Sequence, residues 1–299
     1  MNAKLKRLTD GGRLLLDGGL GEELVNRGID TSTGLWSAQA LLSEPDKVVA
    51  AHRDFIDAGA DVLTTNSYST TRRRFPDDGD FQRMNRSAGA LAQRARAEAE
   101  RDVAIAGSLP PIFGSYRPEL VRPMAELEPL YRAQADILAE YVDLFLCETM
   151  STSGEALAAA RAAAATGLPV WVSWTLADDG TGKLRSGETV TQAVEALDGL
   201  DVRAVLVNCA IPESVDAALP ELARAAAGRP FGAYANAFQP IAPGTGVNDG
   251  RELPDARADL GPDAYADFAG GWLDAGARIV GGCCEVGPSH IARLKERFF

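Results

Sequence analysis

Short hydrophobic runs alternate with longer, alanine-rich helical stretches along the whole chain. The runs predict eight strands, at Arg13–Asp17, Asp61–Thr65, Val103–Ser108, Leu144–Glu148, Val170–Thr175, Ala204–Asn208, Phe231–Ala235 and Arg278–Gly282. The stretches between them predict eight helices, at Asp46–Ala58, Phe81–Arg101, Leu127–Glu140, Ser153–Ala165, Val190–Leu197, Glu213–Ala227, Pro262–Ala275 and Pro288–Phe298. Several helices end at a glycine, which readily adopts the left-handed conformation that stops a helix.

Repeated strand-then-helix units indicate a particular architecture. Because the strands are apolar throughout, they are expected to form a parallel sheet that is buried on both faces. Eight such units are the number that closes into a (β/α)₈ TIM barrel. A doubly wound sheet is the alternative, but its usual five or six strands leave segments unassigned. No Gly/Ser linker or charge block divides the chain, so residues 1–299 are expected to form one α/β barrel domain.

Three long loops follow predicted strands, at Pro110–Glu126, Leu176–Glu188 and Pro240–Leu260. In a barrel, loops that follow strands lie on the face that carries the active site. Long loops without regular structure are uncommon unless they serve a function. The longest of the three, Pro240–Leu260, is therefore a candidate for a lid.

Composition and charge exclude several classes of protein. The chain is 46% hydrophobic with a net charge of −12, and this acidic balance argues against nucleic-acid binding. No apolar run approaches the roughly 20 residues that cross a bilayer, and the basic N-terminus lacks the features of a signal peptide. With only four cysteines, the protein is expected to be cytoplasmic, where disulfides are rare. Its expected partners are small-molecule substrates, and the sequence leaves the oligomeric state open.

Three of the four cysteines end predicted strands: Cys209, Cys283 and Cys284. Strand ends of a barrel converge on one rim, so these three side chains can meet around one ion. Thiolates are soft ligands that suit zinc, and three of them leave one of its four tetrahedral positions open. A thiol entering that position would lose its proton and stay nucleophilic, which predicts alkylation of a substrate sulfur. Cys147 lies inside an apolar strand and is predicted to be a buried thiol.

Polar residues at the other strand ends suggest how a substrate binds. Asp17 and Glu148 would attract an ammonium group; alternatively, Asp17 caps the following turn and Glu148 bonds backbone amides. Backbone N–H groups of Gly18–Gly21 could bind a carboxylate. The expected substrate-binding set is Asp17, Gly18, Gly19, Thr65, Glu148 and Asn236.

Three aromatic residues lie in or near the rim loops: Trp36, Tyr68 and Trp174. Their π faces could flank a cationic methyl donor, although each could equally be a packing residue. The two histidines, His52 and His290, fall in predicted helices and are interpreted as structural. A Ser-His-Asp or Cys-His mechanism therefore has little support.

These residues together resemble the homocysteine S-methyltransferase family over essentially the whole chain. The likeness lies in Asp17-Gly18-Gly19, Leu35-Trp36-Ser37-Ala38, Glu44-Pro45, Ala58-Gly59-Ala60-Asp61, Gly107-Ser108-Leu109, Glu148-Thr149, Asn208-Cys209, Gly281-Gly282-Cys283-Cys284, Gly287-Pro288 and His290-Ile291. The most specific feature is Asn-Cys with a later Gly-Gly-Cys-Cys. The resemblance implies that Cys209, Cys283 and Cys284 bind zinc, and that Asp17 and Glu148 hold the amino group of homocysteine. It further implies that zinc-bound homocysteine thiolate attacks a methyl group on a sulfonium or ammonium donor and gives methionine.

The chain also departs from the family pattern. The family often has Tyr-Pro-Asn after the seventh strand, where this chain has Tyr234-Ala235-Asn236. Leu-Trp-Ser-Ala favours the branch that uses S-methylmethionine or S-adenosylmethionine over the betaine branch. Betaine or another onium donor, and another thiol or selenol acceptor, remain alternatives. Other hypotheses are a barrel enzyme that binds phosphate at Gly281-Gly282 and a zinc or redox-sensing thiol protein.

Overall fold

Eight parallel strands form a ring in the computed structural model, which describes residues 2–30, 34–242 and 254–299. The strands are β1 (Leu14–Leu15), β2 (Val62–Thr64), β3 (Ala104–Leu109), β4 (Leu144–Met150), β5 (Val170–Thr175), β6 (Val202–Asn208), β7 (Phe231–Tyr234) and β8 (Ile279–Val280). From β2 to β8 each strand pairs with the next one in sequence, and β1 pairs with β8. A parallel bridge between Leu16 and Val62 joins β1 to β2. The predicted (β/α)₈ barrel is therefore confirmed.

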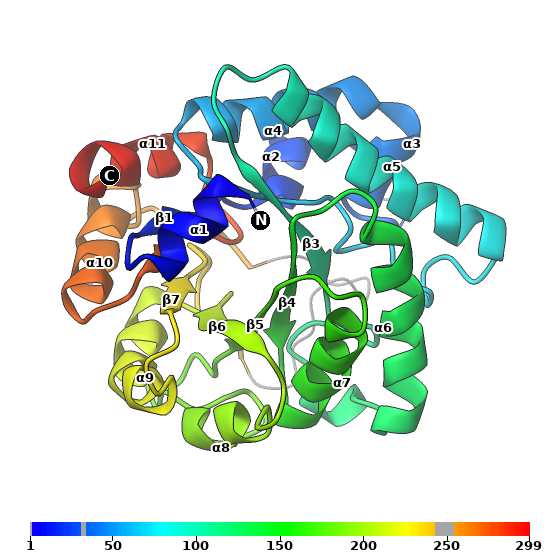
Figure 1. Cartoon of the computed structure of the whole chain (residues 1–299). Helices are drawn as coiled ribbons and strands as arrows, with labels where there is room; N and C mark the ends of the chain where they lie inside the picture. The colour runs from blue at the N-terminus through cyan, green and yellow to red at the C-terminus, as the bar shows by residue number, and fades with distance from the viewer. Residues whose placement is uncertain (1, 31–33, 243–253) are drawn as a thin grey trace.

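Helices surround this ring (Figure 1). They are α1 (Ala3–Thr9), α2 (Leu20–Asn26), α3 (Ala38–Ser43), α4 (Pro45–Asp57), α5 (Asp78–Ala97), the short 3₁₀ helix η1 (Pro118–Leu120), α6 (Met124–Leu138), α7 (Ser153–Ala164), α8 (Val190–Glu195), α9 (Pro212–Ala225), α10 (Pro262–Asp274) and α11 (Pro288–Phe298). The eight predicted helices correspond to α4–α11. The sequence did not predict α1, α2 and α3, which have seven, seven and six residues. Two turns or fewer give too short a periodic pattern to recognise.

Side chains of each strand alternate between two layers of core. In β4, Leu144 and Leu146 pack inside the barrel. Phe145 and Cys147 instead pack against the surrounding helices. Cys147 is fully buried there, as expected of a structural thiol. The same alternation turns Glu148 toward the barrel axis at the carboxyl end of the strand.

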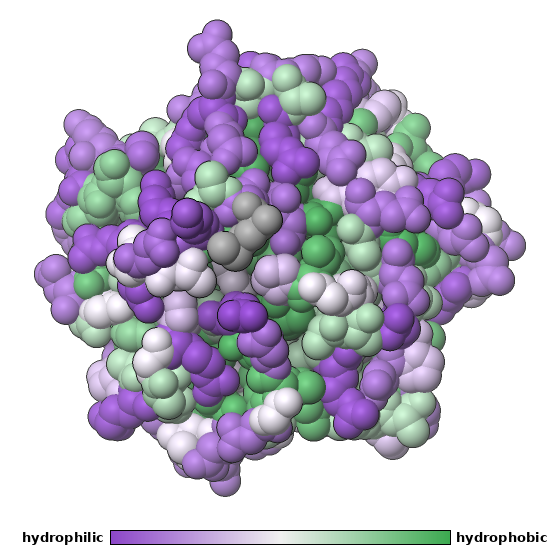
Figure 2. All heavy atoms as spheres, in the orientation of Figure 1, coloured by the Kyte–Doolittle hydropathy of each residue, from purple (hydrophilic) through white to green (hydrophobic). Residues whose placement is uncertain are grey.

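The first helix closes the end of the barrel at which the strands begin. Leu5 and Leu8 of α1 are buried in the interior cluster, and α1 lies across the ring in Figure 1. Figure 2 shows the same face, where hydrophilic residues dominate and hydrophobic residues show in patches between them. Within the described part of the chain, no helix is both long and apolar enough to cross a membrane.

A buried carboxylate holds α1 in place. The side chain of Asp61, at the start of β2, is fully buried. It bonds Lys4 Nζ at 2.9 Å, an Arg7 nitrogen at 2.5 Å and an Arg101 nitrogen at 3.1 Å, and it accepts from the backbone N–H of Leu15 at 3.2 Å. Burial acts to raise the pKa of Asp61, but the cations outweigh it and hold that pKa below its usual value.

We expect Asp61→Asn to lower the free energy of unfolding by about 3 kcal/mol, because it leaves three cations beside a neutral amide. Urea unfolding measures the change. The matched control is Asp57→Asn, which removes an exposed carboxylate from the end of α4. If the two variants unfold at the same urea concentration, the Asp61 cluster does not stabilise the fold.

Candidate active site

Three sulfur atoms meet at the carboxyl end of the barrel. Cys209 follows β6, and the adjacent Cys283 and Cys284 follow β8. The Cys209 sulfur lies 2.7 Å from that of Cys283 and 3.7 Å from that of Cys284, and the last two are 4.0 Å apart. Thiolates on a tetrahedral zinc lie about 3.8 Å apart, so two of the three separations fit and the third is shorter. Among the described residues, this is the one cluster of three or more side chains that could hold a metal ion.

The pKa values of these three thiols depend on one another. Burial acts to raise the pKa of Cys209, but hydrogen bonds from Cys283 and Cys284 outweigh it and hold that pKa well below the usual value. The same bonds, made with the Cys209 sulfur, raise the pKa of Cys284. Without a cation the cluster therefore favours one thiolate and two thiols, because like charges at this separation repel. A divalent cation would allow all three to ionise.

Two glycines bring the loop after β1 against the cysteine doublet. A Cβ atom on Gly18 would lie 1.9 Å from the carbonyl oxygen of Val286, and one on Gly19 would lie 2.6 Å from that of Cys283. No larger residue fits at either position. The N–H of Gly19 donates to Val286 at 3.0 Å. One of the N–H groups predicted to meet a substrate carboxylate is thus engaged within the protein.

Several residues near the three sulfurs have a strained backbone conformation. In the described part of the chain, six non-glycine residues have a positive φ: Trp36, Tyr116, Thr149, Cys209, Ala227 and Glu285. Trp36, Tyr116 and Cys209 line the cavity above the cysteines. Residues held in this conformation cost of order 1 kcal/mol or more each and cluster at functional sites.

Asp17 is fixed by the neighbouring strand. It is 2% exposed, and its carboxylate accepts from the backbone N–H of Thr64 at 2.7 Å and from the Thr64 hydroxyl at 2.8 Å. Burial raises the pKa of Asp17 to about 7, with a smaller contribution from the charge of Glu148. The side chain of Asp17 thus bonds Thr64 of the neighbouring strand rather than the turn that follows Asp17, and it lines the cavity.

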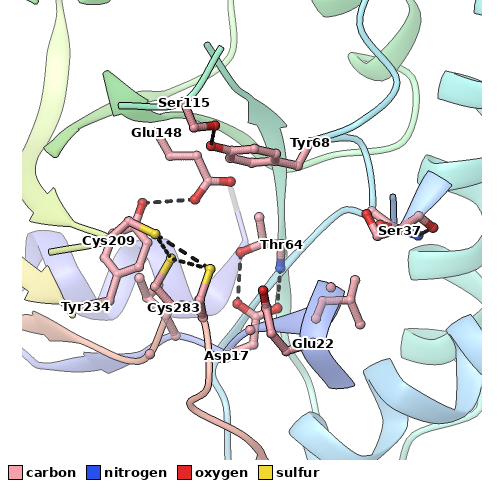
Figure 3. A pocket seen from close by; sticks show the side chains of 18 of the residues that line it. Asp17, Glu22, Ser37, Thr64, Tyr68, Ser115, Glu148, Cys209, Tyr234 and Cys283 are labelled. Carbon is pink, nitrogen blue, oxygen red and sulfur yellow. Dashed lines mark hydrogen bonds between the residues drawn. The ribbon is translucent and has the colours of Figure 1, made fainter. Parts of the chain in front are cut away.

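Glu148 is fixed by two hydroxyl groups. It accepts from the Ser108 hydroxyl at 2.5 Å and from the Tyr234 hydroxyl at 3.2 Å. Burial raises the pKa of Glu148 to about 7, and the charge of Cys209 adds to the effect. Figure 3 shows Glu148 pointing into the same space as the cysteines. A bound cation would therefore favour the ionised form of this carboxylate.

Of the other predicted site residues, some line the cavity and others do not. Thr65, Trp36 and Tyr68 line the cavity, and the Tyr68 hydroxyl bonds Ser115 at 2.7 Å. Asn236 is fully buried outside the lining, where its side chain accepts from the N–H of Phe238 at 3.3 Å. Trp174 packs in the layer between barrel and helices.

Several residues of the cavity lining were not predicted as site residues, among them Tyr116 and Glu22. The Tyr116 hydroxyl lies 2.9 Å from the Cys209 sulfur, and Glu22 lies in the first turn of α2. Tyr116 falls inside the predicted loop Pro110–Glu126, where no sequence pattern indicates which way a side chain points. Glu22 follows Asp17 by five residues, and only the presence of α2 turns it into the cavity.

The candidate lid Pro240–Leu260 falls mostly on residues 243–253, which lie outside the described residues. Its start is described: Ile241 packs with Tyr116 and Cys209 beside the cavity.

Neither histidine lies in the cavity lining. His290 contacts the carbonyl oxygen of Leu260 at 3.1 Å through Nε2. His52 is fully buried in α4, and neither ring nitrogen has a hydrogen-bond partner. Burial lowers the pKa of His52 to about 4.

Protonation of His52 should destabilise the protein in mild acid. Its pKa in the folded state lies below the unfolded value of about 6.5, so the unfolded chain binds the proton first as pH falls. We expect wild type to lose about 3 kcal/mol relative to His52→Leu between pH 6.5 and pH 4, and no further below that. Urea unfolding across this range measures the difference. Parallel stability curves for the two proteins would show that His52 does not titrate in this way.

Known proteins resemble the chain over nearly all its length. The family profile described as homocysteine S-methyltransferase matches residues 14–298. A homocysteine S-methyltransferase from Escherichia coli (strain K12) is 31% identical, covering 95% of this chain and 94% of its own length. A selenocysteine Se-methyltransferase from Brassica oleracea var. italica is 26% identical, covering 96% and 89%. The solved structure of the homocysteine methyltransferase MmuM from Escherichia coli, metallated form, is 29% identical with a TM-score of 0.82, covering 98% of this chain and 99% of that one.

Proposed function

The chain belongs to the homocysteine S-methyltransferase family and is an S-methyltransferase, and we propose that it methylates homocysteine from a sulfonium donor with the help of zinc. The donor is S-methylmethionine or S-adenosylmethionine, and the product is methionine. The observation that carries the proposal is the meeting of three cysteine sulfurs, all within 4.8 Å of one another, beside a cavity with two oriented carboxylates.

Cys209, Cys283 and Cys284 would hold the zinc. Their sulfurs are a soft donor set, and no cationic side chain is present among the described residues that line the cavity. When bound there, zinc would acidify an incoming thiol and keep it as a nucleophilic thiolate.

Asp17 and Glu148 would hold the ammonium group of homocysteine. Both carboxylates line the cavity, and their bonds to Thr64, Ser108 and Tyr234 fix their direction. A ligand held at both ends presents its sulfur in a fixed direction, and such positioning can supply much of the rate acceleration. A neutral thioether leaves without protonation, so the reaction needs no general acid.

Two alternatives receive less support. Phosphate binding at Gly281-Gly282 conflicts with the packing there, because a Cβ on Gly282 would lie 2.0 Å from Val286, and the Gly282 N–H already bonds Asp17. Lys183, which a lysine-dependent barrel enzyme would need in its cavity, is exposed. The function of a zinc or redox-sensing protein does not require two oriented carboxylates beside its thiols.

Methyl transfer tests the proposal directly. Homocysteine is offered with S-methylmethionine, S-adenosylmethionine or betaine, and methionine is measured. We expect methionine from at least one sulfonium donor and little from betaine. A zinc-loaded protein that yields no methionine would contradict the proposal; activity with a selenol or another thiol would then identify a related methyltransferase.

A further inference from the structure

A third carboxyl group lines the cavity beside the two already described. Glu22 is 7% exposed, and it shares the cavity with Asp17 and Glu148. Figure 3 shows Glu22 next to Asp17, directed into the space that the cysteines also face. No lysine, arginine or histidine is among the described residues of the lining. The cavity therefore holds one carboxyl group beyond the two that the proposed ammonium group would pair with.

Glu22 differs from the other two carboxylates in its bonding. Asp17 and Glu148 each have both oxygens paired within the protein. By contrast, the Oε1 atom of Glu22 is buried with no hydrogen-bond partner. Leaving a buried carboxylate oxygen unpaired is costly. Such a group is suited to bind a ligand that supplies a partner for the unpaired oxygen.

The residues around Glu22 indicate where in the cavity its carboxylate would meet a ligand. The Oε2 atom of Glu22 and the Cα atom of Cys284 lie beside the same glycine, 3.0 Å and 3.1 Å from the position that a Cβ atom on Gly19 would take. The residue before Glu22, Gly21, packs so closely on Trp36 that a Cβ there would lie 2.8 Å from the indole nitrogen. Glu22 and Trp36 line the same cavity as the sulfur cluster, so a cation bound there can meet both a carboxylate and a π face.

We propose that Glu22 determines donor specificity by pairing with the positive onium centre that carries the methyl group. The inference rests on the proposed function. The acceptor brings one ammonium group, for which Asp17 and Glu148 are oriented, and the sulfonium centre of the donor is a further cation that enters the same cavity. An uncharged methyl compound would leave Glu22 unpaired and would bind poorly.

The charge changes during transfer predict a kinetic signature. The homocysteine sulfur forms a bond to the methyl carbon while the bond from that carbon to the onium sulfur breaks. The electron pair of the broken bond stays on the leaving sulfur, which becomes a neutral thioether. Glu22 therefore stabilises the bound donor more than the transition state, and it affects donor binding more than the chemical step.

The test compares wild type with Glu22→Gln, with S-methylmethionine as donor. We expect the donor KM to rise about 10- to 100-fold with a kcat that is unchanged or higher, while the KM for homocysteine stays within about twofold. Glu23→Gln is the matched control, since Glu23 is on the same helix but pairs with Arg27 outside the cavity. Glu22→Asp, which retains the charge, should recover part of the loss. Zinc content must equal that of wild type, which separates donor binding from metal loss.

Three results would overturn the inference. An unchanged donor KM in Glu22→Gln would show that the carboxylate does not meet the donor. A rise in the KM for homocysteine instead would assign Glu22 to the acceptor. If Glu22→Gln does not fold, a wild-type donor KM in Glu22→Ala decides against it. Failure of wild type to make methionine from any donor is distinct, because it removes the proposed function itself.

Discussion

Replacement of Cys209 by alanine is expected to abolish zinc binding and to lower methyl transfer by more than about 1,000-fold. The variant keeps only Cys283 and Cys284, which are adjacent in sequence and supply two ligands where three are needed. Metal affinity that depends on several ligands falls steeply when one is removed. Metal analysis of protein purified under reducing conditions measures the loss, and the methionine assay measures the activity.

Cys147→Ala is the matched control for this experiment. Cys147 is fully buried but packs against the helices, away from the three sulfurs. We expect this variant to keep its zinc and its activity, at a cost of about 1 kcal/mol in stability. Full zinc content in Cys209→Ala, or zinc loss in Cys147→Ala, would exclude the proposed ligand set.

Glu148→Gln should lower kcat/KM for homocysteine by about 100-fold. The amide has the size of the carboxylate but no charge, so the substrate ammonium loses a buried partner. The effect should fall on the KM for homocysteine, with the donor KM nearly unchanged, which is opposite to the pattern for Glu22→Gln. Initial rates over a grid of both substrates measure the two constants.

Glu155→Gln separates this effect from the loss of any buried charge. Glu155 is 1% exposed at the start of α7 and accepts from the N–H of Ser151 at 3.1 Å. Like Glu148, its pKa is raised by burial to about 7, but it does not line the cavity. Equal losses of kcat/KM in both variants would mean that Glu148 acts only through stability.

The sequence predicted much of this architecture for physical reasons. Buried parallel strands must be apolar on both faces, so all eight appeared as hydrophobic runs. Barrel closure then brought Cys209 beside Cys283 and Cys284, although more than 70 residues separate them in sequence. Glu148 was recognisable because a charged residue directly follows a buried apolar run.

Side-chain direction and short elements could not be predicted in the same way. The side chain of Trp174 points outward because Ser173, one residue earlier, points into the barrel and bonds Asn208. The sequence of an apolar strand that is buried on both faces does not show which side chains point into the barrel and which point outward. Glu22 depends on the seven-residue α2, and Tyr116 on a loop with positive φ. Both positions are set by tertiary packing, which local sequence does not encode.

X-ray absorption at the zinc edge, before and after addition of homocysteine, tests most directly whether three cysteines hold a metal with a position open for the substrate. We expect three sulfur neighbours at about 2.3 Å in the free protein and four once homocysteine is bound. Protein purified without zinc, or a sulfur count that homocysteine leaves unchanged, would contradict it.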